Sequence, residues 1–555
     1  MLLDVYPAKA FYRPGETVRL VVRLADPAQL GVQIVASVSF LAEEVARLTC
    51  TASLTAEDTA AVDLVWVPPS VAPRGYGVDV QVLDGHGLAL ATASTAFDVL
   101  EHWTQAPRYG FLTDYAPGRS NVDETMQWLT RHHINGLQFY DWMYRHDQFL
   151  PPEDLFDDPL GRQLSLATVR HLIDAAHSRG IAALPYTAVY AASLPFFELH
   201  PDWALFDADG KPIPFGDRFL MIMNPAPHSP WTQHLLNQFS AVLQETAFDG
   251  IHLDQYGDPK VAYDAGGNRV DLAQALPDLV DATVKTAVKV RPGAAVLFNC
   301  VGNWPIEGSA RSQQDLNYIE VWPPNTLFKD LYSLIVEAQA LSGGKPVVLA
   351  AYIDPARARN VRLADAVILA SGGTHIELGE PGAMLADPYF PNYGRMSDDL
   401  STVIRRYYDF AVRYENILAL DTRDATPAFE GRVAVEGLNT DAERLYNKVW
   451  PIVREGADAI GLSLINLLEL DSPEWVGALT TGPLVQRDLL VRVSTGRPVR
   501  RVWWATADGD SPAAQDLEFS TETSGDCPCV SFRVPWLAYW HLIVLELGRG
   551  SQEIP

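Results

Sequence analysis

Short apolar runs with alternating polar positions fill the first hundred residues of the chain. Turn signals such as Arg13-Pro14-Gly15 and Asp84-Gly85 separate these runs, and no helical period is present. This pattern is typical of an immunoglobulin-like β-sandwich, which we place at residues 1–104. The expected strands cover residues 18–24, 32–40, 61–67 and 77–83.

From Tyr109 the pattern changes, because apolar runs of buried type now alternate with longer segments of helical period. This order predicts repeated βα units, and eight such runs predict a closed (β/α)8 TIM barrel over residues 105–421. The expected barrel strands are 109–115, 134–142, 181–190, 250–256, 294–301, 317–322, 346–353 and 374–379. The expected helices include 165–179, 277–290, 327–342 and 401–420, and the first three each end at or near a glycine.

Beyond residue 421 the chain returns to short strands and turns. We interpret residues 422–555 as an antiparallel β-sandwich packed against the barrel. The predicted fold class is therefore multidomain α/β, with a central TIM barrel flanked by an N-terminal immunoglobulin-like β-sandwich and a C-terminal antiparallel β-sandwich.

Charge narrows the range of partners. The chain has 42 Lys and Arg against 69 Asp and Glu, a formal net charge of −27. An acidic surface of this kind repels phosphate backbones and anionic lipids, so nucleic acid and membrane surfaces are not expected partners. The longest apolar run, at residues 346–353, is much shorter than the roughly 18 to 20 residues that cross a bilayer.

The first residues and the cysteines of the chain indicate the cellular compartment in which we expect it. The chain begins Met1-Leu2-Leu3-Asp4 without the pattern of a signal peptide, which predicts a cytoplasmic protein, or a secreted one if the numbering starts after a removed leader. The spacing of the four cysteines fits neither a disulfide framework nor a zinc site, so free thiols are expected. We expect no cofactor, no bound metal, and a monomer or weak homo-oligomer.

Polar and aromatic side chains gather at the carboxyl ends of the predicted barrel strands, where TIM barrels carry their active sites. No cluster of Lys or Arg accompanies them. Carboxylates, amides and aromatic rings without cations suit a neutral sugar better than a phosphorylated substrate. The candidate substrate-binding residues are Asp114, Tyr140, Asp141, Trp142, Tyr186, His252, Tyr256, Asn299, Trp322, Tyr352 and Glu377.

Two of these strands predict a pair of catalytic carboxyl groups. Side-chain alternation points Asp254 into the barrel mouth from the fourth strand, and Glu320 from the sixth, between Tyr318 and Trp322. We expect Asp254 to stay ionised among hydrogen-bonding groups, and the aromatic neighbours of Glu320 to raise its pKa and keep it protonated. Glycoside hydrolysis uses two carboxyl groups divided in this way.

Alternative interpretations of these residues remain open. Asp114, Asp141 and Asp254 could together supply oxygen ligands for Mg²⁺ or Ca²⁺, or form structural ion pairs. His132-His133, at a predicted helix end, is better explained by the helix dipole or by solvation than by a metal. Buried positions in the core are favoured over a sugar-binding surface for Trp475 and Trp503-Trp504.

Several segments resemble the dextranases and cycloisomaltooligosaccharide glucanotransferases of glycoside hydrolase family 66. The similarity spans the N-terminal sandwich and the barrel. It is carried by residues 11–18 (FYRPGETV), 138–142 (QFYDW), 248–258 (FDGIHLDQYGD), 318–322 (YIEVW), 343–345 (GGK) leading into 350–352 (AAY), 373–379 (GTHIELG), 407–410 (YYDF) and 414–416 (YEN).

The resemblance implies an endo-acting, retaining enzyme on α-1,6-glucans such as dextran or isomaltooligosaccharides, with Asp254 as nucleophile and Glu320 as general acid/base. A retaining mechanism predicts carboxyl groups about 5 to 5.5 Å apart. The predicted barrel strands leave no room for the inserted carbohydrate-binding module that cyclising members carry, which favours hydrolysis over cyclisation. A transglycosylase that uses the same residues and a non-catalytic carbohydrate-binding barrel are the alternatives.

Overall fold

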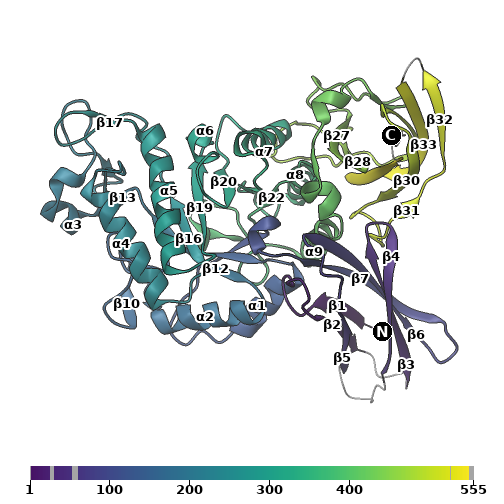
Figure 1. The fold of residues 1–555 in the computed structure, drawn as a ribbon, viewed down its shortest axis with the longest axis horizontal. Helices are drawn as coiled ribbons and strands as arrows, with labels where there is room; N and C mark the ends of the chain where they lie inside the picture. The colour runs from purple at the N-terminus through teal and green to yellow at the C-terminus, as the bar shows by residue number, and fades with distance from the viewer. Residues whose placement is uncertain (1, 26–30, 53–59, 525–526, 549–555) are drawn as a thin grey trace, which may run out of the picture.

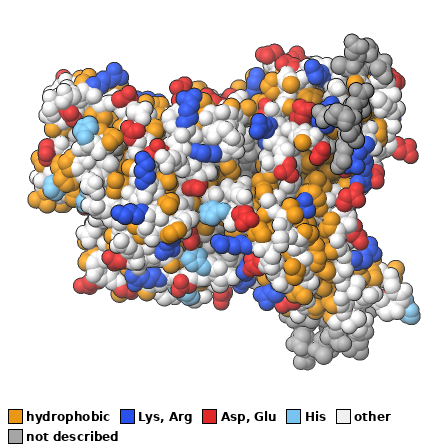
Figure 2. Space-filling view, viewed as in Figure 1, with side chains coloured by type: hydrophobic (Ala, Val, Ile, Leu, Met, Phe, Trp, Pro, Cys, Tyr) orange, Lys and Arg blue, Asp and Glu red, His pale blue; other side chains and the backbone are white. Residues whose placement is uncertain are grey.

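The computed structural model describes residues 2–25, 31–52, 60–524 and 527–548. Figure 1 shows a barrel on the left, with the N-terminal strands at its lower right and the C-terminal strands at its upper right. Within the described residues, no helix is long and apolar enough to span a membrane. Figure 2 shows acidic and basic side chains interspersed over the visible face, without an extended basic patch.

The N-terminal strands form two antiparallel sheets. One sheet has the order β1 (Leu2–Pro7), β2 (Val18–Ala25) and β5 (Ala60–Trp66). The other has the order β4 (Glu43–Ala52), β3 (Val32–Phe40), β6 (Arg74–Leu83) and β7 (Ala89–Val99). Val22 of the first sheet and Ile34 and Val78 of the second share one buried core, which confirms the predicted β-sandwich.

Eight parallel strands form the central sheet, as predicted. In chain order they are β8 (Tyr109–Leu112), β9 (Gly136–Phe139), β12 (Ala182–Ala188), β16 (Gly250–Asp254), β19 (Ala295–Val301), β20 (Leu316–Glu320), β21 (Val347–Ala350) and β22 (Thr374–His375). The backbone N–H of Phe111 donates to the carbonyl of Leu378 at 3.0 Å, which links the first strand to the segment after the last. A side chain at Gly110 would lie 2.7 Å from this carbonyl, so the closing seam requires glycine there.

A helix follows each barrel strand before the next one begins or the ring closes. In chain order they are α1 (Val122–Arg131), α2 (Leu166–Ser178), α4 (Pro230–Glu245), α5 (Leu272–Val290), α6 (Ile306–Ser309), α7 (Phe328–Ser342), α8 (Ala358–Ala370) and α9 (Asp398–Arg413). The α7 helix ends at Gly343, whose φ of 73° lies in the left-handed region that favours glycine.

Two helix predictions need correction. The predicted start at Pro277 is five residues late, because α5 begins at Leu272 and continues through Pro277. This proline lies inside the helix, where it lacks the backbone N–H that would donate to the carbonyl four residues earlier. The predicted helix over 401–420 is in fact α9 up to Arg413, followed by a π-helical turn over Asn416–Leu420.

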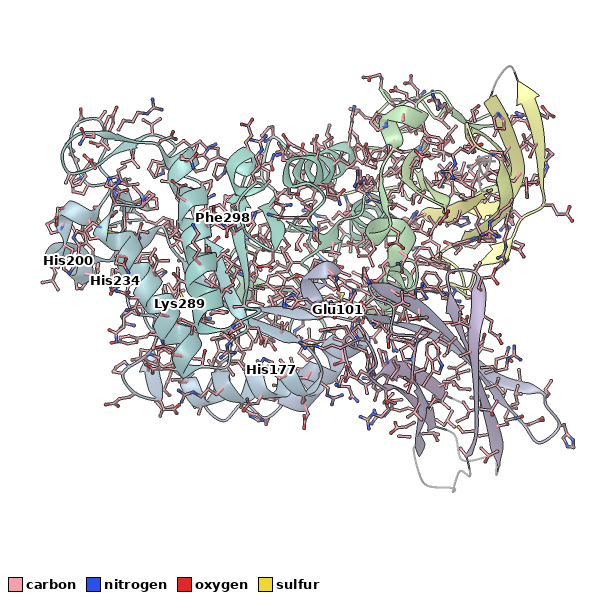
Figure 3. The ribbon with its side chains drawn as sticks, in the orientation of Figure 1. Glu101, His177, His200, His234, Lys289 and Phe298 are labelled. Carbon is pink, nitrogen blue, oxygen red and sulfur yellow. The ribbon has the colours of Figure 1, made fainter. Side chains whose placement is uncertain are left out.

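The loops at the carboxyl ends of the strands carry additional short elements. After β9 come β10 (Leu155–Asp157) and β11 (Gln163–Ser165). After β12 the chain forms β13 (Ala191–Ser193), α3 (Leu194–Leu199), β14 (Pro214–Phe215) and β15 (Leu220–Ile222), and after β16 it forms β17 (Ala262–Tyr263) and β18 (Arg269–Val270). The loop after β22 contains β23 (Ala383–Met384) and β24 (Gly394–Arg395). His200 and His234, labelled in Figure 3, mark the end of the barrel farthest from the sandwiches, where α3 packs beside α4.

The C-terminal strands form a second pair of antiparallel sheets, which confirms the predicted β-sandwich. One sheet has the order β25 (Thr422–Asp424), β27 (Val449–Gly456), β28 (Ala459–Asn466), β34 (Trp540–Leu547), β30 (Val499–Ala505) and β31 (Gln515–Asp516). The other has the order β26 (Val433–Val435), β29 (Gln486–Ser494), β33 (Cys527–Leu537) and β32 (Phe519–Ser524). Domain limits at residues 104 and 421 stay predictions.

The structure shows the location of several residues whose role the sequence left open. Trp475, Trp503 and Trp504 are all buried, as favoured. His132 and His133 are also buried, so solvation does not explain them: Nδ1 of His132 lies 2.8 Å from the Trp128 carbonyl, and Nε2 of His133 lies 2.8 Å from Asp409. Cys50, Cys300 and Cys529 are free thiols, whereas Cys527 begins β33 and its side chain lies outside the described part.

Candidate active site

A pocket of about 760 Å³ opens at the carboxyl ends of the barrel strands. Both Asp254, the last residue of β16, and Glu320, the last residue of β20, line it. The β19 strand lies between these two strands and contributes Asn299. The alternation of side chains predicted for β16 and β20 therefore holds up to Asp254 and Glu320, the two predicted catalytic residues.

Strand register sets the two carboxyl groups on either side of Asn299. Leu253 pairs with Phe298, so Asp254 and Asn299 follow side by side, while Glu320 pairs with Val301 of the same β19 strand. Phe298, labelled in Figure 3, is buried on the opposite face of β19, which leaves Asn299 free to face the pocket.

Hydrogen bonds hold both carboxyl groups in place. The amide Nδ2 of Asn299 donates to Asp254 Oδ1 at 2.7 Å and to Glu320 Oε2 at 2.8 Å. Because both oxygens contact the same nitrogen, they cannot be more than about 5.5 Å apart. Tyr186 donates to the other oxygen of Asp254 at 2.7 Å, and Tyr352 donates to the other oxygen of Glu320 at 2.8 Å.

Burial governs the protonation of this pair. It raises the pKa of Asp254 to about 7, the charge of Glu320 adds to the rise, and the bonds from Tyr186 and Asn299 oppose it. Burial also raises the pKa of Glu320, against the bonds from Asn299 and Tyr352. Two carboxyl groups this close resist ionising together, so the pair keeps a proton to higher pH than isolated carboxyl groups do.

One detail of the electrostatic prediction needs correction. The sequence predicts a low pKa for Asp254 among hydrogen-bonding groups, but burial and the neighbouring Glu320 outweigh its two hydrogen bonds. For Glu320, burial raises the pKa, which is the predicted direction. Trp322 is 37% exposed, so it encloses Glu320 less than the buried Tyr318 does.

Comparison with known proteins assigns the chain to a family. The family model of glycosyl hydrolase family 66 matches residues 7–544. The chain belongs to glycosyl hydrolase family 66. It is therefore an enzyme of the glycoside hydrolase type.

The relatives of this family 66 chain carry two different enzyme names. A cycloisomaltooligosaccharide glucanotransferase from Niallia circulans is 24% identical over 705 residues, covering 98% of this chain and 71% of the relative. A dextranase from Streptococcus salivarius is 23% identical, covering 85% of this chain and 67% of the relative. The crystal structure of a Paenibacillus cycloisomaltooligosaccharide glucanotransferase, complexed with cycloisomaltoheptaose, matches the fold with a TM-score of 0.91 at 21% identity and covers 98% of this chain and 99% of that one.

Seven of the eleven predicted substrate-binding residues line the pocket of this family 66 enzyme. They are Tyr140, Asp141, Tyr186, Tyr256, Asn299, Trp322 and Tyr352. Tyr140 stacks on Phe390 with ring centroids 4.3 Å apart, and Tyr256 is 50% exposed. These rings offer aromatic surfaces on several sides of the two carboxyl groups.

The other four predicted residues lie elsewhere. Asp114 is exposed two residues after the end of β8 and does not line the pocket. The alternative cation site of Asp114, Asp141 and Asp254 therefore does not assemble there. Trp142 is fully buried and donates to the Tyr186 carbonyl. His252 lies within the barrel, where burial lowers its pKa to about 3 and Tyr109 contacts its Nδ1 at 3.1 Å. Glu377 is fully buried in a different cavity.

Several pocket residues that come from the loops are not among the predicted site residues. Tyr190, Phe215 and Phe219 belong to the insertion between β12 and α4, and Tyr389 and Phe390 to the loop after β22. The aromatic content of these long loops is the signal that could have found them. Lys260 also lines the pocket and places one cation there, which the strand ends alone do not show.

Replacing Tyr352 with phenylalanine tests the electrostatics of Glu320. Tyr352 stabilises the ionised carboxylate and so lowers its pKa, which means that Tyr352→Phe raises that pKa. We expect the basic limb of the pH profile of kcat/KM to move up by about one pH unit. Tyr389→Phe, which removes a hydroxyl from another wall of the same pocket, is the control. A limb that stays in place or moves to lower pH would contradict the assignment of Glu320 as the acid.

Proposed function

We propose that this family 66 enzyme is an endo-acting hydrolase of α-1,6-glucosidic bonds in dextran or isomaltooligosaccharides, with retention of configuration. The observation that carries the proposal is the bridge from Asn299 to Asp254 and Glu320, which keeps two carboxylate oxygens within about 5.5 Å. Retaining enzymes hold their carboxyl groups about 5 to 5.5 Å apart, and inverting enzymes about 6.5 to 9.5 Å. The spacing supports direct attack by one carboxylate, without an intervening water.

In the first half of the proposed reaction, ionised Asp254 attacks the anomeric carbon. The bond to the departing oxygen breaks, and protonated Glu320 gives its proton to that oxygen. The raised pKa of Glu320 keeps this proton available. Ionised Asp254 is the reactive form, and the donors Tyr186 and Asn299 favour it.

In the second half, Glu320 is the base. It takes a proton from a water molecule, which attacks the anomeric carbon and releases Asp254 as a carboxylate. Two inversions leave the product with the α configuration of the substrate. Tyr352 and Asn299 stabilise the ionised Glu320 between the two halves, because both donate to its carboxylate.

The second candidate is transglycosylation with the same residues, in which a sugar hydroxyl replaces water. The names of the Niallia circulans and Paenibacillus relatives favour it. The name of the Streptococcus salivarius relative favours hydrolysis. The alignment with the Niallia circulans enzyme spans 705 positions against the 555 residues of this chain, so that relative contains segments absent here, in keeping with the missing inserted module.

An assay of reducing ends tests the substrate and the reaction together. We expect dextran to yield new reducing ends and a rapid loss of chain length, whereas pullulan and starch react at least tenfold more slowly. Product analysis separates the two candidates, because hydrolysis gives linear isomaltooligosaccharides and transfer gives cyclic or longer products. Equal rates on starch and dextran would contradict the α-1,6 assignment. Cyclic products as the main outcome would decide for the glucanotransferase.

A further inference from the structure

Three buried side chains gather outside the catalytic pocket, at the last strand of the barrel. Asp365 of α8 is 3% exposed, His375 of β22 is 5% exposed and Glu377, two residues later, is 0% exposed. Nδ1 of His375 lies 2.9 Å from Asp365 Oδ1 and 3.4 Å from Glu377 Oε2. One ligand atom from each residue falls within 4.8 Å of the other two.

Three of the four carboxylate oxygens in this group lack a hydrogen-bond donor among the described residues, while Asp365 Oδ1 is bonded to His375 Nδ1. Neither oxygen of Glu377 has a hydrogen-bond partner among the described residues, nor does Oδ2 of Asp365. Buried polar atoms are nearly always paired, and an unpaired buried carboxylate is strongly destabilising. One imidazole N–H cannot satisfy three free oxygens. A positive centre must therefore lie between the carboxylates. Without an ion, this centre is the proton on Nδ1 of His375: burial lowers the pKa of this histidine, but the charges of Glu377 and Asp365 and the bonds to them outweigh burial and raise that pKa to about 10.

The orientation of His375 points Nδ1 of its ring at these carboxylates. Its Nε2 lies 2.8 Å from the carbonyl of Ala351 and donates to it, which leaves Nδ1 facing Asp365 and Glu377. Histidines that bind metals use the same arrangement, in which one ring N–H donates to a backbone carbonyl and the other nitrogen coordinates the ion.

Charge and geometry identify the ion. We propose that Asp365, His375 and Glu377 bind one Zn²⁺ ion. The ion displaces the proton on Nδ1 of His375 when it binds. Two carboxylates, a neutral imidazole and a dication then sum to zero charge, which suits a buried site. Ligand atoms at about 2.0 to 2.2 Å from zinc lie roughly 3 to 3.5 Å from one another, and the two measured separations from Nδ1 are close to this range. One nitrogen with two oxygens suits zinc better than Ca²⁺, which takes six to eight oxygens.

The surroundings leave space for the fourth ligand. All three side chains line a cavity of about 300 Å³ that is separate from the catalytic pocket. A water molecule in this cavity completes a tetrahedral site. The ion joins α8 to β22 and to Glu377. The next residue, Leu378, accepts at its carbonyl the hydrogen bond that closes the barrel. Its role is therefore to fasten the closing seam of the barrel.

Metal analysis of the full chain tests the site. The protein is produced with added Zn²⁺, passed through gel filtration and measured by mass spectrometry of the elements. We expect about one zinc per chain and a fall of several degrees in Tm after removal by a strong chelator, reversed by Zn²⁺ but not by Mg²⁺ or Ca²⁺. Less than about a tenth of an ion per chain, with no rise in Tm on adding Zn²⁺, would overturn the proposal.

Variants locate the ion. Glu377→Gln and Asp365→Asn keep the size of each side chain and remove the charge, so both should lose at least tenfold in zinc affinity. Asp399→Asn, an exposed position on α9, is the control and should bind zinc as the unaltered chain does. Zinc bound at full stoichiometry by both ligand variants would place the ion elsewhere and overturn the assignment. The measurements on the unaltered chain decide the question if neither variant folds.

Discussion

Asp254→Gly is expected to abolish the first displacement with every substrate, whatever its leaving group. The variant lacks the atom that attacks the anomeric carbon, so the rate on dextran and on an activated aryl α-glucoside should both fall by about 10⁴-fold or more. Added azide can occupy the vacated space and attack from the face that Asp254 uses. The product of such a rescue is a β-glycosyl azide, identified by nuclear magnetic resonance.

The control for this variant is Asp264→Asn. Asp264 is a half-buried residue ten positions along the same chain segment, in the turn between β17 and β18, and it does not line the catalytic pocket. Its replacement should leave both rates within twofold of the unaltered enzyme. An α-glycosyl azide from Asp254→Gly, or substantial activity without azide, would show that Asp254 is not the nucleophile.

Glu320→Ala is expected to separate the two substrates. Dextran needs a proton on its departing sugar oxygen, so its cleavage should fall by about 10³-fold or more, whereas an aryl α-glucoside with a good leaving group still forms the glycosyl-enzyme. Release is then slow, because no base activates water. Azide should raise turnover and give a product of α configuration, because it attacks the intermediate from the face that water uses.

Glu337→Gln, at an exposed position on α7, is the control for the loss of a glutamate charge. It should leave both substrates and the azide effect unchanged. A Glu320→Ala enzyme that loses the aryl substrate as completely as dextran, or that gives a β-glycosyl azide, would mean that the two roles are exchanged.

Alternation along a strand predicts the catalytic pair because β16 and β20 run without interruption to Asp254 and Glu320. It fails where a strand stops earlier. Asp141 lies beyond β9 with a left-handed φ of 51°, and this turn directs Trp142 into the core. Asp114 also lies beyond the end of its strand, β8. Its side chain therefore follows the course of the loop and not the alternation of the strand.

The sequence also does not show how deep in the barrel a side chain lies. His252 shares a face with Asp254 but lies one pleat deeper, roughly 7 Å along the strand, and is covered by the residues above it. The bridging role of Asn299 depends on the register of β19 against two neighbours that are distant in sequence. Spacing along the chain predicts Asn299 as a site residue, but pairing between strands determines what it does.

The covalent intermediate offers the most direct test of the proposed mechanism. Glu320→Gln is mixed with α-isomaltosyl fluoride, whose fluoride departs without a proton donor, and the intermediate accumulates because the base is missing. Peptide mapping by mass spectrometry should then find one isomaltosyl group attached to the carboxylate of Asp254. Turnover without any labelled peptide, or a label on a residue other than Asp254, would contradict a double displacement at this aspartate.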